Sequence, residues 1–217
     1  MKCGLIFDLD GTLVDSLNGI AASLNHALHE SNLPTHSHDA VRGFIGNGAR
    51  ILIERGTPAG STDILIDVVE QAFKAHYDLH WPTGTIAYDG IKNLLENLQS
   101  QGHQLAVLSN KPHPFTEAMV GRLFPTIRFA MVLGQRAGTP HKPDPTGALE
   151  IATTLGLAPA QCCLIGDSTM DIETAFNAGM QAVAVTWGFH DRERLMAAGA
   201  TSLADDPAAL MTMISPN

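Results

Sequence analysis

The segment Leu5–Thr12, with the sequence LIFDLDGT, constrains this chain more than any other. Its apolar start predicts a buried strand, which ends in two acidic residues, Asp8 and Asp10. On an extended chain this spacing directs both carboxylates to one face, and Gly11 allows a sharp turn that a β-carbon would resist. Neighbouring carboxylates repel each other unless a cation or a shared proton compensates. The segment therefore predicts a metal-dependent active site.

The pattern Asp-x-Asp-Gly also begins calcium-binding EF-hand loops, and Asp-Gly alone is a common turn. An EF-hand requires a Glu at its twelfth position, and counting from Asp8 that position is Gly19. The calcium hypothesis therefore fails. A strand followed by an ordinary turn stays open on this segment alone, and the rest of the chain argues against it.

Composition excludes several classes of function. The formal charge is −9, from 13 Lys and Arg against 22 Asp and Glu, without a basic cluster that would bind a nucleic-acid backbone. No apolar run approaches the ~20 residues of a membrane span, and the start at Met1 lacks the pattern of a signal peptide. Cys3, Cys162 and Cys163 suit buried thiols in a reducing compartment. We expect a cytoplasmic monomer or homodimer that binds neither nucleic acid nor membranes.

The hydrophobic pattern changes once along the chain. Between residues 15 and 82 apolar residues recur at helical spacing without a clear strand, and the segment 81–84 (Trp-Pro-Thr-Gly) ends this pattern. Beyond it, apolar strands predicted at 104–108, 129–133, 162–165 and 181–185 alternate with helices. This alternation predicts an α/β fold, a Rossmann-like doubly wound parallel sheet formed by residues 1–14 and 83–217. An all-helical domain, residues 15–82, is inserted after the first strand.

Ligands bind beyond the carboxyl ends of the strands in such sheets. Polar residues collect there in four separate segments: Asp8-Leu9-Asp10, Ser109-Asn110-Lys111, His141-Lys142-Pro143-Asp144-Pro145 and Gly166-Asp167-Ser168-Thr169-Met170-Asp171. Packing alone does not explain why polar groups distant in sequence gather at one edge, so we predict a shared site.

These four segments, in this order, resemble the haloacid dehalogenase superfamily, specifically its phosphatases with a helical cap after the first strand. The resemblance covers nearly the whole chain. Within the superfamily the chain is most similar to the phosphoglycolate phosphatase group, through the segments 7–16, 109–111 and 46–48.

The resemblance implies roles for individual residues. Asp8 would be the nucleophile that forms an aspartyl-phosphate, and Asp10 would act as general acid and then general base. Lys142 would place positive charge beside the nucleophile and the transferred group. Mg²⁺ would be the cofactor, held by Asp8, the backbone carbonyl of Asp10 and Asp167, with Asp171 acting through a water molecule or another ligand.

The resemblance also implies substrate contacts. Thr12, Ser109 and Asn110 would bind the phosphoryl group, although Ser109 and Asn110 also suit a helix cap. Lys111 would either bind substrate or lie in solvent. In the inserted domain, Gly46 and Asn47 would contact the leaving group, since the glycines at 46 and 48 let backbone approach a ligand. Arg50 would pair with the carboxylate of that group. A turn between helices followed by a surface arginine stays open as the alternative for these three residues.

The predicted function is therefore Mg²⁺-dependent hydrolysis of a small phosphorylated metabolite such as 2-phosphoglycolate. Asp10 argues against dehalogenation, where no leaving oxygen needs a proton. A phosphomutase of the β-phosphoglucomutase type stays open, although Thr12 favours hydrolysis, as does a nucleotidase or pyrophosphatase. A phospho-accepting signalling receiver is the alternative from another class, but receivers are about half this size and lack a helical insert.

Overall fold

The computed structural model describes residues 3–214, which form two compact units. One unit contains the chain up to Val14 and again from Ala87 onward, and the other contains Asp15–Ile86. Two short strands, β2 (Val14–Asp15) and β3 (Ile86–Ala87), pair where the chain passes from one unit to the other. The helical segment is thus inserted after the first strand of the α/β unit.

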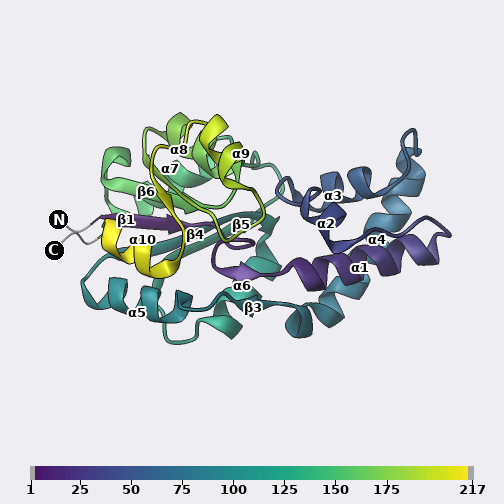
Figure 1. The fold of residues 1–217 in the computed structure, drawn as a ribbon, viewed down its shortest axis with the longest axis horizontal. Helices are drawn as coiled ribbons and strands as arrows, with labels where there is room; N and C mark the ends of the chain where they lie inside the picture. Colours follow the sequence, from purple (N-terminus) through teal and green to yellow (C-terminus); the bar gives the residue numbers. More distant parts are fainter. Residues whose placement is uncertain (1–2, 215–217) are drawn as a thin grey trace. The chain divides into compact units, whose positions relative to one another are not determined.

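A six-stranded parallel sheet forms the centre of the α/β unit (Figure 1). Its strands lie in the order β5 (Phe129–Gln135), β4 (Gln104–Pro112), β1 (Gly4–Phe7), β6 (Cys162–Gly166), β7 (Gln181–Val185) and β8 (Leu203–Ala204). All five pairings are parallel. The central strand β1 is buried along its whole length, as its apolar sequence predicts.

Helices cover both faces of this sheet. They are α5 (Ile91–Ser100), α6 (His113–Leu123), α7 (Thr146–Leu155), α8 (Thr169–Ala178), α9 (Arg192–Ala197) and α10 (Pro207–Ile214). Helices α7 and α8 lie on one face and α5 and α10 on the other (Figure 1). The core beneath α7 and α8 includes Ile6, Ile151 and Leu164. This architecture confirms the predicted doubly wound α/β fold.

The strand register brings the segments that follow three strands to one edge of the sheet. Phe7 of β1 pairs with Val107 of β4 and with Ile165 of β6. Asp8 extends the pairing by one residue, because its backbone N–H donates to the carbonyl of Ile165 at 2.9 Å. The polar residues after β1 and β6, and those in the last part of β4, therefore emerge at the same carboxyl edge.

The second unit consists of α1 (Leu17–Glu30), α2 (His38–Arg42), α3 (Gly48–Gly56) and α4 (Asp63–Gly84). Helices α1 and α4 approach closely where two glycines meet, since a β-carbon on Gly84 would lie 2.5 Å from the Cα of Gly19. Apolar side chains from both helices are buried in this unit, among them Leu24 and Phe73. Across the described residues, no helix is both long and apolar enough to cross a membrane.

Two sequence expectations about local structure were wrong. Helix α4 does not stop before Trp81 but continues through Pro82 to Gly84. Proline removes one amide donor from the helical ladder, while Trp81, 7% exposed, keeps the last turn packed in the core. The expected boundary between residues 82 and 83 therefore lies inside α4. Strand β4 likewise runs four residues past the predicted end at Leu108, to Pro112.

Candidate active site

Asp8 lies directly after β1, with its side chain buried among charged groups. Its Oδ1 accepts the backbone N–H of Leu9 at 2.7 Å and lies 2.9 Å from Nζ of Lys142. Its Oδ2 receives no hydrogen bond from the described residues. Burial raises the pKa of Asp8 to about 7; Lys142 lowers it, and the carboxylate of Asp171 raises it. Asp8 therefore depends on nearby positive charge to ionise.

Lys142 supplies that charge from the loop between β5 and α7. It is 5% exposed, and its Nζ lies 2.6 Å from Oδ1 of Asp171 and 3.2 Å from the carbonyl of Leu108. Burial lowers the pKa of Lys142, but Asp171 and Asp8 raise it by more, so its net pKa lies above the usual value. The ammonium therefore stays protonated between two carboxylates.

Asp167 and Asp171 complete a buried acidic cluster with Asp8. One oxygen from each of the three lies within 4.8 Å of the others. Asp167 is held at both oxygens, by the hydroxyl of Thr12 at 3.0 Å and the N–H of Phe189 at 2.7 Å. Burial raises the pKa of Asp167 well above its ordinary value, and the carboxylates of Asp8 and Asp171 raise it further.

Asp171 caps helix α8 from within this cluster. Its Oδ2 accepts the backbone N–H of Ser168 at 3.0 Å and the hydroxyl of Ser168 at 2.6 Å. Gly166, the last residue of β6, makes room for it, because a β-carbon there would lie 2.2 Å from Cγ of Asp171. The strand end and the helix cap together fix this carboxylate.

The cluster suits a divalent cation. Three buried carboxylates face the single ammonium of Lys142, which leaves negative charge uncompensated at low dielectric. All the donor atoms in the cluster are hard carboxylate oxygens, the ligands that Mg²⁺ prefers. Asp8, Asp167 and Asp171 are the residues that would hold such an ion.

Asp10 lies beside this cluster and pairs with the second buried lysine. Nζ of Lys111 lies 3.1 Å from each carboxylate oxygen of Asp10. Gly11 turns the chain between Asp10 and Thr12 with a φ of +85°, and a β-carbon there would lie 2.2 Å from Oδ2 of Asp167. Lys111 is buried beside Asp10 and does not lie in solvent, while its contact with substrate stays a prediction.

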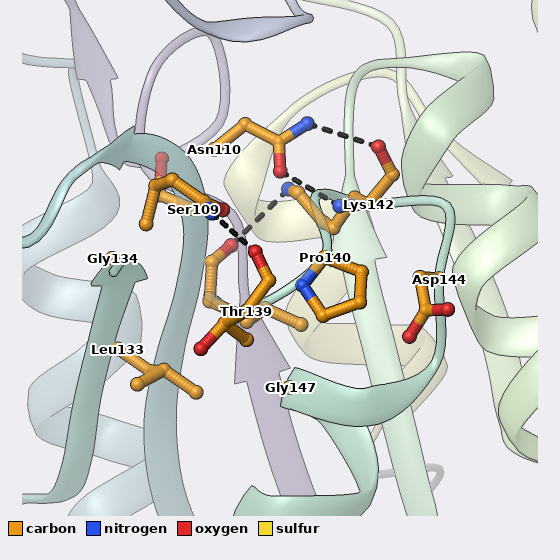
Figure 2. A pocket seen from close by; sticks show the side chains of 11 residues that line it. Ser109, Asn110, Leu133, Gly134, Thr139, Pro140, Lys142, Asp144 and Gly147 are labelled. Carbon is orange, nitrogen blue, oxygen red and sulfur yellow. Dashed lines mark hydrogen bonds between the residues drawn. The ribbon is translucent and has the colours of Figure 1, made fainter. Parts of the chain in front are cut away.

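Ser109 and Asn110 follow the apolar part of β4 and line a small pocket with Thr139, Pro140 and Lys142 (Figure 2). The hydroxyl oxygen of Ser109 accepts the backbone N–H of Lys111 at 3.2 Å, so its own proton is available to donate. The carboxamide of Asn110 bonds the backbone of Lys142. Neither side chain caps helix α6, for which Pro112 is the N-cap residue.

The loop after β7 contributes residues that sequence analysis did not assign to the site. Trp187 donates its Nε1–H to the carbonyl of Thr12 at 3.0 Å, and Phe189 donates to Asp167. A β-carbon on Gly188 would lie 2.3 Å from Cβ of Asp167. This loop follows a strand that ends at the same edge as β1 and β6, which is the signal that would have identified it.

The predicted residues of the helical unit are engaged within that unit. Arg50 of α3 forms ion pairs with four of its carboxylates: Glu54 at 3.2 Å, Glu70 at 3.3 Å, Asp63 at 3.4 Å and Asp67. Asn47 accepts a hydrogen bond from Arg55 at 2.9 Å, and Gly46 precedes it with a φ of +122°. These contacts give Arg50 and Asn47 structural roles, and their contact with substrate stays a prediction.

The fold and the site define a class of α/β proteins with a cluster of buried aspartates at the carboxyl edge of a parallel sheet. The chain matches the haloacid dehalogenase-like hydrolase family over residues 5–185. It is 32% identical over 211 residues to a phosphoglycolate phosphatase of Pseudomonas putida, and the alignment covers 95% of this chain and 78% of the relative. It is 33% identical over 212 residues to a phosphoglycolate phosphatase of Escherichia coli K12, and the alignment covers 88% of this chain and 84% of the relative.

Solved structures agree with this assignment. A crystal structure from Lactobacillus delbrueckii subsp. bulgaricus superposes with a TM-score of 0.94 at 31% identity, covering 100% of both chains. A predicted phosphoglycolate phosphatase from Haemophilus somnus gives a TM-score of 0.90 at 30% identity, covering 99% of this chain and 98% of that one. The chain therefore belongs to the haloacid dehalogenase-like hydrolase family, and it is a phosphatase. The family resemblance seen in the sequence is confirmed.

Proposed function

We propose that this phosphatase hydrolyses 2-phosphoglycolate with Mg²⁺, through an aspartyl-phosphate formed on Asp8. The observation that carries the proposal is the contact of 2.9 Å between the buried Asp8 carboxylate and the protonated Lys142, within a cluster suited to a divalent cation. The proposed substrate is supported by the relatives, since those at 32% and 33% identity are named phosphoglycolate phosphatases.

In the first step a carboxylate oxygen of Asp8 attacks phosphorus, and the bond from phosphorus to the substrate's alkoxide oxygen breaks. Asp10 in its protonated form donates its proton to that leaving oxygen. Lys142 offsets the negative charge on the nucleophile and the transferred group. The hydroxyl of Ser109 donates a hydrogen bond to a phosphoryl oxygen. The backbone N–H groups of Gly11 and Thr12 are bonded within the turn, to the carbonyls of Val14 and Leu9, so they take no part in this step.

In the second step water attacks phosphorus of the aspartyl-phosphate. Asp10, now ionised, accepts a proton from that water, and the bond between phosphorus and the Asp8 oxygen breaks. The products are inorganic phosphate and the original Asp8 carboxylate, with Asp10 protonated again for the next turnover. Bound Mg²⁺ would reduce the repulsion between carboxylate and phosphate dianion.

The proposed preference for 2-phosphoglycolate depends on how the site binds the glycolate leaving group. Lys111 is 8% exposed and places a buried ammonium next to the acid that protonates the leaving oxygen. A leaving group with a carboxylate close to its alkoxide matches that charge. We assign the helical unit the role of a cap that excludes water and selects the leaving group.

The test measures phosphate release from 2-phosphoglycolate, sugar phosphates, nucleoside monophosphates and pyrophosphate, with Mg²⁺ and then with EDTA. We expect release that depends on the metal and is fastest on 2-phosphoglycolate. Asp8→Asn should abolish turnover while circular dichroism stays unchanged, and Asp89→Asn, an exposed residue of the same unit, should leave activity intact. Substantial turnover by Asp8→Asn would refute the nucleophile, and phosphate transfer between sugar positions without release would indicate a mutase.

A further inference from the structure

Asn110 of β4 bonds both polar groups of the Lys142 backbone (Figure 2). Its Nδ2 donates to the carbonyl oxygen of Lys142 at 3.1 Å, and its Oδ1 accepts the backbone N–H of Lys142 at 2.8 Å. Because one partner is an acceptor and the other a donor, only this orientation of the carboxamide satisfies both. Asn110 and Lys142 are 6% and 5% exposed, so water does not compete strongly for these bonds.

Strand β4 also holds the other end of the lysine. Nζ of Lys142 lies 3.2 Å from the carbonyl of Leu108, which is two residues before Asn110 on the same strand. The backbone of Lys142 and its ammonium are thus both attached to β4. Between these attachments the side chain reaches Asp8 at 2.9 Å and Asp171 at 2.6 Å.

We infer that Asn110 is a positioning residue for Lys142, and that it acts on the reaction through the lysine rather than as a ligand of the phosphoryl group. The inference rests on the proposed role of Lys142 as the charge beside Asp8. A lysine side chain is a flexible four-carbon stem, so the place of its ammonium depends on where its backbone is fixed. Lys142 lies in the connection between β5 and α7, and Asn110 ties that connection to the central sheet.

Another contact with this connection comes from outside the site. Asn177 of α8, an exposed residue, donates its Nδ2–H to the carbonyl of Pro143 at 2.9 Å. It holds the residue next to Lys142 but touches neither the lysine nor the carboxylates of the cluster. Asn177→Ala is therefore the matched control for Asn110→Ala, since each removes an asparagine contact with the same segment.

The first measurement separates kcat from the binding of phosphate. Asn110→Ala should lower kcat for 2-phosphoglycolate by about 10- to 100-fold, the cost of an ammonium displaced by about 1 Å. The KM and the inhibition constant of inorganic phosphate should change by less than about 3-fold, because no phosphoryl contact is lost. Asn177→Ala should change kcat by less than about 2-fold.

The second measurement is a double-mutant cycle with Lys142→Met. If Asn110 acts only through the lysine, adding Asn110→Ala to Lys142→Met should lower kcat by no more than about 2-fold further. Equal losses from Asn110→Ala in both backgrounds would overturn the inference, as would a rise in the inhibition constant of phosphate that matches the fall in kcat/KM.

Two controls keep the outcomes distinct. Full activity of Lys142→Met would refute the proposed role of that lysine, and the positioning inference would be refuted with it. A large loss of activity in Lys142→Met, with a further, additive loss from Asn110→Ala, would refute the positioning inference alone. Should Asn110→Ala fail to fold, the isosteric Asn110→Asp keeps an acceptor for the Lys142 N–H and loses the donor to its carbonyl. Asn110→Asp is then tested in the same double-mutant cycle, and its melting temperature is compared with that of the wild type to show that it folds.

Discussion

Nζ of Lys111 lies 3.1 Å from both carboxylate oxygens of Asp10, in a pair that joins residues 101 positions apart in the sequence. Their side chains are 6% and 13% exposed. An ion pair this buried orients its members, because neither can turn away without leaving an uncompensated charge. The structure thus attaches one lysine to the proposed acid/base and the other, Lys142, to the proposed nucleophile.

Replacing Lys111 should slow hydrolysis most for substrates with poor leaving groups. In Lys111→Met the side chain of Asp10 loses the partner that orients it toward the leaving oxygen, and we expect kcat/KM for 2-phosphoglycolate to fall by about 10- to 100-fold. An aryl phosphate should lose less, because its leaving oxygen needs little protonation. Lys92→Met, at an exposed position on α5, is the control and should match wild type on both substrates. Equal losses on alkyl and aryl phosphates would contradict a role near the leaving group.

Gly188 should be essential for metal affinity. A β-carbon there would lie 2.3 Å from Cβ of Asp167 and 2.4 Å from the carbonyl oxygen of Gly11, so Gly188→Ala must displace a proposed metal ligand. We expect Mg²⁺ affinity to drop by about 10- to 100-fold, measured by calorimetric titration of the metal-free protein. Gly121→Ala in α6, where nothing lies within 4 Å, should bind Mg²⁺ as wild type does. Unchanged affinity in Gly188→Ala would show that Asp167 does not hold the ion.

The stability of the metal-free protein should fall as pH rises. Burial raises the pKa of Asp8 to about 7, and the pKa of Asp167 is raised for the same reason. Between about pH 4 and pH 7 the folded chain therefore binds more protons than the unfolded chain, so the free energy of unfolding decreases with pH. Mg²⁺ replaces those protons, and its stabilising effect should grow over the same range.

Melting temperatures with and without Mg²⁺ at pH 5 and pH 8 check this expectation. The metal-free protein should lose roughly 5 °C or more at the higher pH. Asp167→Asn, which removes one of the two groups, should reduce that loss. A melting temperature that is constant or rises toward pH 8 would mean that these carboxylates ionise normally.

Arg50 offers a test of the helical unit. Because the structure pairs it with carboxylates of α3 and α4, we expect Arg50→Ala to lower the melting temperature by no more than a few degrees. The ratio of kcat/KM for 2-phosphoglycolate to that for an aryl phosphate should stay constant. A selective loss on 2-phosphoglycolate would instead support the sequence-based prediction that Arg50 binds the substrate's carboxylate.

The sequence by itself determined the fold class and the edge of the sheet at which the site lies. Apolar runs such as Leu5–Phe7 mark buried strands because burial depends on local hydrophobicity. The parallel arrangement then sends Asp8, Asp167 and the polar last residues of β4 to one edge. The motifs at those strand ends were sufficient to identify the family. Each of these properties depends on short stretches of chain and on their order.

The tertiary structure decided which charged groups meet. Nothing local to Lys111 shows that it pairs with Asp10. The family resemblance placed Lys142 beside Asp8, but its contact with Asp171 appears only in the structure. The backbone contact of Asn110 was likewise invisible in the sequence, as was the contact of Gly188 with Asp167. Hydrogen bonds and ion pairs form only when groups far apart in the chain are placed to within a few tenths of an ångström of the right distance. Those distances are fixed only when strand register and loop paths come together in the folded molecule.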